Sequence, residues 1–189
     1  MKIAIIGAGN VGHALETGWK KKGHEIRFGK RESNRDAAQW GEVVVLATPW
    51  PATKDAIAAC GTLAGKVVLD ATNPLLPNLA GLDHADGSGG ERVARWAQGA
   101  KVVKIFNTTG FNNMQDARYG MAKPMMLYCG DDAGAKAVAK RLSDDLGFDS
   151  IDFGPLSNAR YSEGMAMAWI WLAVKGNVGR DIAFVLARR

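Results

Sequence analysis

The sequence is poor in the residues that build disulfide frameworks and metal sites, with two cysteines and three histidines among 189 residues. Cys60 and Cys129 lack the spacing of metal ligands and lie in apolar contexts, so we expect two buried thiols. The histidines are scattered along the chain, and we interpret His13 as a surface residue rather than a ligand. A structural metal is therefore not expected.

Long apolar runs are also absent. No stretch approaches the roughly 18 apolar residues that a membrane span needs, and the apolar run at residues 3–6 is too short for a signal peptide. We therefore expect no membrane partner and a cytoplasmic location. The net charge of +5 suits an anionic small ligand or weak attraction to nucleic acid. No run of Lys and Arg interleaved with aromatic residues occurs, so we expect no specific nucleic-acid partner.

Short apolar segments alternate with helical patterns along most of the chain. We predict strands at residues 3–6, 24–28, 42–47, 67–71, 101–106, 125–129 and 150–153. We predict one helix directly after the first glycine turn and a second over residues 52–59. A third is predicted to start at the capping-box spacing of residues 88–91 and to end near residue 98. A fourth is predicted to start at the acidic pair 131–132 and to end at residue 146. This alternation predicts a Rossmann-type, doubly wound α/β fold with a mostly parallel sheet.

The segments outside this alternation are harder to assign. Residues 159–189 predict two helices, divided near Gly176, that form a C-terminal helical cap on the sheet. Residues 107–123 show no clear pattern. Residues 75–90 are rich in Gly, Pro, Asn and Asp, and we interpret them as an exposed linker, with a mobile lid as the alternative. No linker or repeat divides the chain, so residues 1–189 are expected to form a single domain.

The first turn carries the strongest chemical signal. It follows a predicted strand, opens a predicted helix and matches G-x-G-x-x-G, a pattern that this context makes specific for dinucleotides. Its residues are Gly7, Ala8, Gly9, Asn10, Val11 and Gly12. In such a turn, Gly7 permits the tight bend, Gly9 lets a pyrophosphate approach the backbone, and Gly12 lets helix and strand pack closely. Free N–H groups and the positive end of the helix dipole then hold the phosphates.

The end of the second predicted strand indicates which dinucleotide is bound. An NAD site places Asp or Glu there to accept a hydrogen bond from the ribose 2′-hydroxyl. Here Gly29 is followed by Lys30 and Arg31. A guanidinium can grip a 2′-phosphate with two hydrogen bonds, and we expect Ser33 and Arg35 to assist. The sequence therefore predicts NADP(H), although a charged surface loop is the alternative interpretation.

The ends of three further strands carry short polar groups beside prolines or glycines. Ligands of open α/β sheets gather at these carboxyl ends, so the groups are candidate contacts for the nicotinamide end of the dinucleotide. The candidates are Thr48, Pro49, Trp50, Asn73 and Asn107. Ordinary turn chemistry is the alternative for each of them, and Trp50 either forms a wall of the site or belongs to the core.

No catalytic residue can be named. The sequence contains no recognisable pair of carboxylates, no Ser/His/Asp set and no lysine in an active-site pattern. Enzymes that reduce a carbonyl or imine usually need an acid or base to move a proton. An enzyme without one requires a hydride acceptor that carries its own chemistry, and a flavin or deazaflavin ring meets that requirement.

The chain resembles the coenzyme F420-dependent NADP oxidoreductases and, more distantly, the NADPH domain of the six-transmembrane ferric reductases. The resemblance covers nearly the whole chain. It rests on the glycine turn and on the segments 29–31, 73–74, 103–108, 130–132 and 154–160, followed by Glu163. The segment 154–160 is the most specific, because a generic Rossmann domain has no reason to contain it.

The resemblance implies that a hydride passes directly between NADPH and a deazaflavin. It implies that Lys30 and Arg31 hold NADP, that Thr48, Asn73 and Asn107 lie near the nicotinamide, and that residues 154–160 shape the acceptor cleft. The segment 33–41 is shorter than the fullest family form. The Trp-rich run at 168–172 matches no deazaflavin pattern, and we interpret it as a buried helix or a dimer face, with a ring-stacking site as the alternative. FMN, FAD or another acceptor is the alternative to a deazaflavin.

Two other functions compete with this prediction. One is a dehydrogenase or reductase of a small carbonyl or imine, which usually has a larger helical substrate domain. The other is a non-catalytic NADP-binding or redox-sensing module. The apolar residues of the C-terminal pattern also predict either a homodimer face or packing against the chain's own sheet; they are Met165, Met167, Trp169, Trp171 and Leu172.

Overall fold

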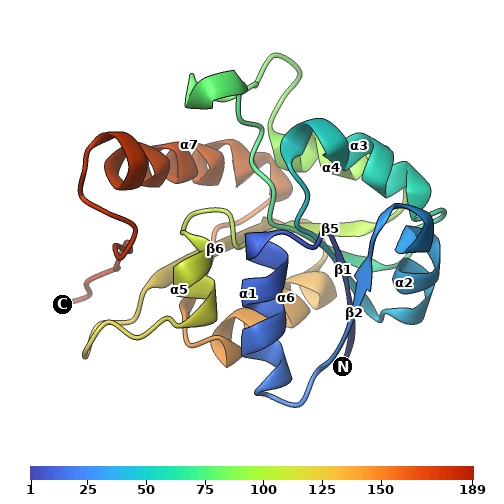
Figure 1. Ribbon diagram of the computed structural model, residues 1–189, viewed down its shortest axis with the longest axis horizontal. Helices are drawn as coiled ribbons and strands as arrows, with labels where there is room; N and C mark the ends of the chain where they lie inside the picture. Colours follow the sequence, from blue (N-terminus) through green and yellow to red (C-terminus); the bar gives the residue numbers. More distant parts are fainter.

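The computed structural model describes residues 1–189 and contains a seven-stranded sheet in the order β2-β1-β3-β4-β5-β6-β7 (Figure 1). The strands are β1 (Lys2–Ile6), β2 (Glu25–Gly29), β3 (Val43–Leu46), β4 (Val67–Asp70), β5 (Lys101–Lys104), β6 (Met125–Gly130) and β7 (Asp149–Asp152). Every neighbouring pair is parallel except β5 and β6. The predicted mostly parallel α/β fold is confirmed. The strand order changes direction between β1 and β3, the kind of position where ligands of such sheets bind.

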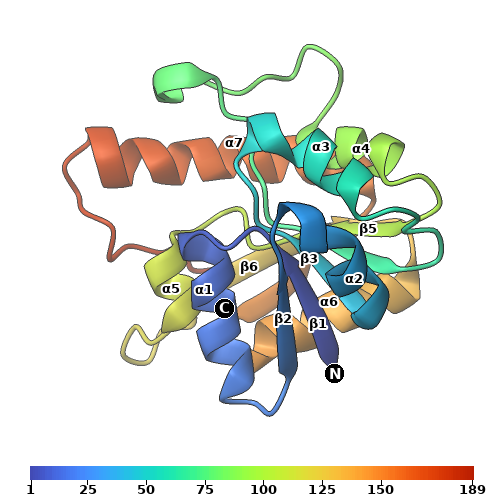
Figure 2. The same cartoon turned by 45° about the vertical axis from the view of Figure 1, so that its right-hand side comes forward.

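Helices cover both faces of the sheet (Figure 2). One face carries α1 (Asn10–Lys20), α5 (Phe111–Gln115) and α6 (Ala133–Asp145); the other carries α2 (Asn34–Trp40), α3 (Trp50–Ala59) and α4 (Gly89–Trp96), with α7 (Ala159–Ile170) beside α4. No helix of the chain combines the length and the apolar character that crossing a membrane requires.

Alternation along the buried strands builds a core on each face. Ile3 and Ile5 of β1 pack under α1, whereas Ala4 and Ile6 face the side of α2 and α3. Side chains of a strand point alternately to opposite faces, so continuous apolar runs are required where both faces are covered. Complete burial of each isoleucine contributes about 1.5–3 kcal/mol.

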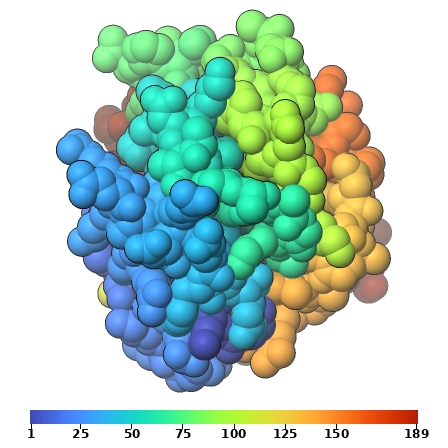
Figure 3. All heavy atoms as spheres, turned by 90° about the vertical axis from the view of Figure 1, so that its right-hand side faces the viewer, coloured from blue at the N-terminus to red at the C-terminus, as the bar shows by residue number.

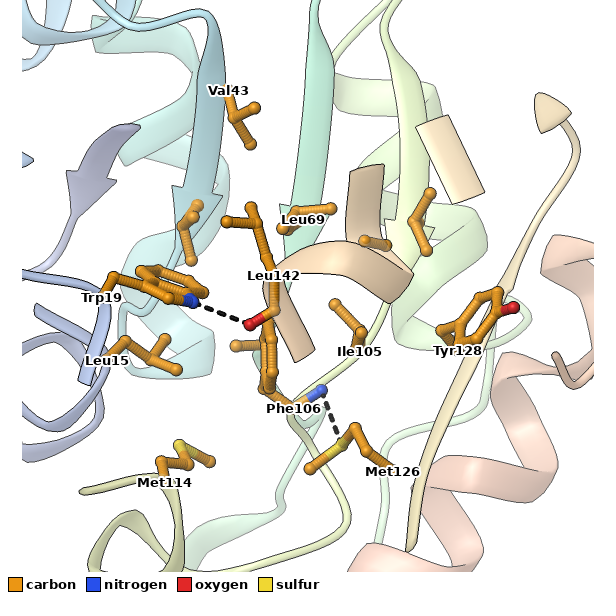
Figure 4. Close-up of a cluster of buried hydrophobic side chains, with 14 of the residues drawn as sticks. Leu15, Trp19, Val43, Leu69, Ile105, Phe106, Met114, Met126, Tyr128 and Leu142 are labelled. Atoms are coloured by element: carbon orange, nitrogen blue, oxygen red, sulfur yellow. Dashed lines mark hydrogen bonds between the residues drawn. The ribbon is translucent and has the colours of Figure 1, made fainter. Parts of the chain in front are cut away.

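Trp19 anchors α1 in the larger core (Figure 4). Its side chain is fully buried, and its indole N–H donates to the carbonyl of Leu142 on α6 at 2.8 Å. Its ring meets the Phe106 ring edge-on, 5.6 Å between centroids. A buried indole needs such a partner. The contact fixes α1, whose first turn begins at the glycine motif.

Two helices lie where no element is predicted from the sequence. Helix α2 occupies the short connection between β2 and β3, and α5 lies within the segment 107–123. Helix α2 has only seven residues and buries only Asn34, Ala37 and Ala38. So short an apolar stripe falls below the periodicity that identifies a helix in sequence.

The prediction of a second C-terminal helix is wrong. After α7 the chain makes a π-helical turn, Trp171–Lys175, and residues 176–189 contain no helix. Asn177 has φ +55° and Gly179 has φ +89°. Left-handed conformations of this kind end right-handed helices.

The final segment uses its backbone carbonyls to bind the rest of the fold. The carbonyl of Ile182 accepts hydrogen bonds from the Trp169 indole at 2.8 Å and from the Asn113 amide at 2.7 Å. The carbonyl of Phe184 accepts from the N–H of Met125 on β6 at 2.8 Å. These bonds replace the internal bonds of a helix, so the cap on the sheet consists of α7 and an extended tail.

Candidate functional site

A cavity of about 630 Å³ lies beside the first glycine turn, where β1, β2 and β3 end. This volume falls within the range of small-molecule sites. The cavity is lined by the turn, by the connection from β2 to α2 and by α3; the lining residues are Ile6, Gly7, Ala8, Gly29, Lys30, Arg31, Glu32, Asn34, Thr48, Ala52, Asp55, Ala56 and Ala59. Figure 3 shows the face on which the blue surface of α2 borders the teal surface of α3.

The glycines of the first turn are required by close approaches of the backbone. A Cβ at Gly7, whose φ is +111°, would lie 2.5 Å from the carbonyl oxygen of Ala47, and a Cβ at Gly12 would collide with the carbonyl of Gly7. At Gly9, by contrast, a Cβ would meet nothing within 4 Å. The backbone at Gly9 therefore faces open space.

Helix α1 begins at Asn10 with its N-terminal N–H groups available. Gly9 is the N-cap, no side chain caps the helix, and the first turn contains no acidic residue. The first four N–H groups of a helix have no partner within the helix, and the positive end of its dipole favours an anion. The open space over Gly9 and these donors together fit a pyrophosphate.

The end of β2 presents two cations to the cavity. Lys30 and Arg31 both line it, and neither forms an ion pair with any carboxylate of the chain. Arg31 is exposed and adopts φ +48°, a conformation that side chains rarely take. A Cβ at Gly29 would lie 2.6 Å from the end of the Ile6 side chain and 2.8 Å from that of Asn34, so a larger residue here would force these side chains to move.

Two residues that the sequence assigned to this site lie outside the cavity lining. The Ser33 hydroxyl accepts from the N–H of Lys30 at 2.9 Å and donates to its carbonyl at 3.2 Å, which closes a 3-10 turn. Arg35 extends alongside Gly61 after α3. The structure therefore brings Lys30 and Arg31 to the cavity and uses Ser33 to shape the turn that holds them.

The residues that follow β3 lie in two different places, one at the cavity and the others among the outer helices. Thr48 lines the cavity, and its hydroxyl hydrogen-bonds that of Thr53 at 2.9 Å. Trp50 instead packs against Trp96 of α4, 5.2 Å between ring centroids, with the Arg92 guanidinium 4.8 Å from its ring. Trp50 belongs to the packing between α3 and α4 and does not form a wall of this cavity; Pro49 also lies outside the lining.

Asn73 and Asn107 join the ends of β4 and β5. The Asn73 amide donates to the backbone carbonyl of Asn107 at 3.0 Å, and the Asn107 amide donates to Asn73 Oδ1 at 3.2 Å and to the Ser162 hydroxyl at 3.4 Å. Asn107 is buried, and its Oδ1 has no hydrogen-bond partner. Buried acceptors are nearly always paired, so the strand end carries one acceptor without a partner within the chain.

A buried charge cluster behind these asparagines is not found by sequence reasoning. Lys104, Asp70 and Glu163 are all fully buried. The Lys104 ammonium lies 3.0 Å from Asp70 Oδ2 and 3.1 Å from Glu163 Oε1, and it donates to the Thr72 carbonyl at 2.5 Å. The only signal in the sequence is a lysine inside the continuous apolar pattern of residues 101–106.

Glu163 connects this cluster to the N-terminus of α4. Its carboxylate accepts from the N–H groups of Gly89 and Gly90, both at 3.0 Å, and hydrogen-bonds His84 Nε2 at 2.9 Å. Burial alone would lower the pKa of Lys104, but the carboxylates of Asp70 and Glu163 outweigh that effect and raise it. Lys104 therefore remains a cation although it is buried.

The segment 154–160, which carries the most specific part of the resemblance, lies beside β6 and α4. Its N–H at Leu156 donates to Asp131 Oδ1 at 3.0 Å, and the Asn158 amide donates to the Phe153 carbonyl at 2.7 Å. The segment does not line the cavity beside the glycine turn. Its contacts fix the start of α7, which carries Glu163.

The two cysteines are buried, as predicted. Burial raises the pKa of Cys60 to about 11 and that of Cys129 to about 12. Reactive cysteines need a stabilised thiolate, so neither thiol has the character of a nucleophile.

The strand order, the glycine turn at the point where that order changes direction and the adjoining cavity define a doubly wound α/β protein of the Rossmann class. Comparison with known proteins identifies the family to which the chain belongs within this class. The family model described as "NADP oxidoreductase coenzyme F420-dependent" matches residues 2–35 and 29–74, which include the glycine turn and the cations after β2.

A protein of Arthrobacter sp. FB24, described in its crystal structure as a candidate F420-dependent NADP reductase, is 30% identical and covers 100% of both chains with a TM-score of 0.90. The F420-dependent NADP reductase of Methanocaldococcus jannaschii is 31% identical over 152 residues, 75% of this chain and 66% of the archaeal protein. The chain belongs to the family of coenzyme F420-dependent NADP oxidoreductases.

The rat metalloreductase STEAP3 is a more distant relative, 26% identical over 181 residues. The match covers 88% of this chain but 36% of the rat protein. The chain thus spans about a third of the length of this relative and 66% of the archaeal one. The resemblance predicted from the sequence is confirmed at the level of the family.

Proposed function

We propose that the chain binds NADP(H) in the cavity beside the glycine turn and transfers hydride between it and a deazaflavin or flavin-like acceptor. Residues 1–189 would act as one NADP-binding unit. The observation that carries the proposal is the pair of unpaired cations, Lys30 and Arg31, in a cavity that begins at the glycine turn. They support NADP over NAD, because a 2′-phosphate supplies the anionic partner that both side chains lack.

The chain's own residues divide the binding task along the sheet edge. The N–H groups at Asn10 and Val11 hold the pyrophosphate over Gly9, and Arg31 grips the 2′-phosphate with two hydrogen bonds. Towards the nicotinamide end, Thr48 lines the cavity, while the unpaired Oδ1 of Asn107 is an acceptor suited to an amide N–H. When bound, NADPH supplies the hydride, and the acceptor ring takes it up.

The choice of a ring acceptor is supported by the burial of the titratable groups nearest the ends of β4 and β5. These groups are Asp70, Lys104 and Glu163, and all three are fully buried and paired with one another. Carbonyl and imine reduction requires a proton at the substrate. A deazaflavin, FMN or FAD ring accepts hydride without a proton from the protein, which supports this class of acceptor.

Hydride transfer is tested by following NADPH absorbance with each acceptor class in turn: deazaflavin, FMN, FAD, ferric chelates and small carbonyls or imines. Turnover with a free ring supports the proposal. Turnover only with carbonyls or imines would replace it with a small-substrate reductase. Tight NADPH binding without turnover on any acceptor would instead favour a redox-sensing or other non-catalytic module.

The cofactor assignment has its own test in Arg31→Ala. Loss of a charged hydrogen bond costs about 1.5–3 kcal/mol, so the variant should bind NADPH roughly 10- to 100-fold more weakly and leave NADH affinity nearly unchanged. Fluorescence titration with both nucleotides measures this. Arg35→Ala is the matched control, because Arg35 lies outside the cavity lining. Equal losses for NADPH and NADH would contradict the assignment.

The homodimer and the cytoplasmic location expected from the sequence belong to the same proposal. Trp171, Leu172 and Val174 are exposed at the end of α7 and on the turn after it, which supports an apolar contact between two copies. Trp169, by contrast, is buried within the chain. Sedimentation of the protein at micromolar concentration measures the oligomeric state.

A further inference from the structure

One wall of the cavity is a single stripe of α3. Four residues of this helix line the cavity: Ala52, Asp55, Ala56 and Ala59. Their spacing of three, four and seven residues places them on one face of the helix. Three of the four side chains are single methyl groups, so the stripe is a smooth apolar surface that carries one carboxylate.

The carboxylate of Asp55 has no partner within the chain. It is exposed and makes no hydrogen bond or ion pair with any side chain, although Lys30 and Arg31 line the same cavity. The two cations and the carboxylate therefore remain separate in one cavity. A ligand that satisfies all three must present an anion to the cations and a hydrogen-bond donor to Asp55.

Asn34 holds the stripe in place from beneath. Its amide donates to the carbonyl of Ala56 at 3.3 Å, and the residue is 3% exposed. Its Oδ1 is buried and has no partner within the chain, and Asn34 is one of the residues that line the same cavity. The α3 side of the cavity thus offers the carboxylate of Asp55, whereas the β2 side offers two cations beside the carboxylate of Glu32.

We propose that Asp55 selects adenine as the base of the dinucleotide by accepting a hydrogen bond from its exocyclic amine. The alanine stripe supplies methyl groups for the flat ring to pack on, and a purine with a carbonyl in place of the amine would turn a lone pair towards the carboxylate. The inference rests on the proposed function, because the base belongs to the same ligand whose 2′-phosphate Arg31 binds. It adds a specificity-determining residue for the base.

The test compares NADPH with deamino-NADPH, which carries hypoxanthine in place of adenine and is otherwise identical. Both dissociation constants are measured by fluorescence titration without any acceptor, so the result does not depend on turnover. The wild-type chain should bind NADPH about tenfold more tightly, the size of one hydrogen bond to a charged group. Because both nucleotides carry the same phosphates, the ratio cancels any effect of overall charge.

Two variants of Asp55 probe the contact in opposite directions. Asp55→Ala extends the alanine stripe with the best helix former, and the ratio should fall to about one. Asp55→Lys replaces the acceptor with a donor, so the ratio should fall below one because the ammonium can donate to the hypoxanthine carbonyl. Asp36→Ala, on the exposed first turn of α2, removes an equal charge outside the cavity and should keep the wild-type ratio.

The outcomes separate the two proposals. Arg31→Ala should weaken both nucleotides and leave their ratio unchanged, which would assign the phosphate to Arg31 and the base to Asp55. Equal binding of the two nucleotides by the wild-type chain, or an unchanged ratio in Asp55→Ala, overturns the role of Asp55 and leaves the proposed function intact. Failure of the wild-type chain to bind NADPH at all overturns both.

Discussion

Lys104 lies in an environment that is unusual for a lysine. Its ammonium is fully buried and satisfied by two carboxylates and a carbonyl. Buried ion pairs add little more to the stability of the fold than well-packed apolar side chains would. Removing one partner, however, leaves a buried charge without compensation. The residue is therefore sensitive to substitution even though it touches no proposed ligand.

Lys104→Met should lower the free energy of unfolding by about 3–5 kcal/mol, because Asp70 and Glu163 would remain buried without their cation. Urea denaturation followed by circular dichroism measures the loss. Lys101→Met on the same strand is the matched control. Its ion pair with Asp132 is partly exposed, so it should cost less than about 1 kcal/mol. A similar loss in both variants would contradict the assigned role of the buried cluster.

At the level of single residues, sequence reasoning succeeds where a residue type is needed for a local reason. Gly7 and Gly12 are required by close approaches of the backbone, and Lys30 and Arg31 follow the strand they were expected to follow. The partners of Lys104 could not be predicted, because Glu163 is 59 positions away in the sequence and only the packing of α7 brings it close.

At the level of elements, α4 illustrates a helix whose start is set by its own sequence. Ser88 is the N-cap: its hydroxyl accepts from the N–H of Glu91, and the Glu91 carboxylate accepts from the N–H of Ser88 at 2.9 Å. This is the capping box predicted from the spacing of the two residues. Burial of Ser88 keeps water from replacing these bonds.

Ser88→Ala should therefore lower the free energy of unfolding by about 1 kcal/mol, the usual cost of losing an N-cap side chain. Thermal and urea unfolding measure the change. The control is Ser157→Ala in the 3-10 turn Leu156–Asn158, where the serine is exposed and forms no side-chain hydrogen bond. If Ser157→Ala costs as much as Ser88→Ala, the effect of Ser88 cannot be assigned to capping.

Elements with strong local signals were predictable, and those decided by tertiary contacts were not. Strands β1, β3 and β4 followed from continuous apolar runs, and α6 followed from its N-cap at Asp132 and from Gly147 beyond its C-terminus. Helix α2 is too short to show a period. Residues 180–186 contain apolar side chains typical of a helix, yet their carbonyls bond to Met125, Asn113 and Trp169, three partners that no local pattern reveals.

At the level of the whole molecule, acid should destabilise the fold through carboxylates whose pKa values are lowered. Hydrogen bonds from Arg118 lower the pKa of Asp116 from 3.8 to about 2, and those from Arg92 lower the pKa of Asp83. A backbone hydrogen bond at the start of α6 lowers the pKa of Asp132. Each lowered pKa adds stability that is present above the unfolded value and is lost as pH falls through the folded value.

The free energy of unfolding should therefore decline as pH falls from about 4 to about 2, and change little between roughly pH 5 and 7. Urea titrations at a series of pH values measure the profile. Asp116→Asn should reduce the decline slightly, because its partner Arg118 is on an exposed loop. Equal stability at pH 2.5 and pH 6 would show that these carboxylates have the same pKa values folded and unfolded.

The contacts of Glu163 have a consequence for how the chain can be shortened. This single carboxylate on α7 joins β5, the start of α4 and the loop at His84. A fragment that ends before α7 would lack the Glu163 carboxylate. Lys104 on β5 and the N–H groups of Gly89 and Gly90 would then lose their anionic partner. The segment from α7 onward is thus no detachable appendage: truncation there should yield aggregation-prone protein instead of a smaller working nucleotide binder.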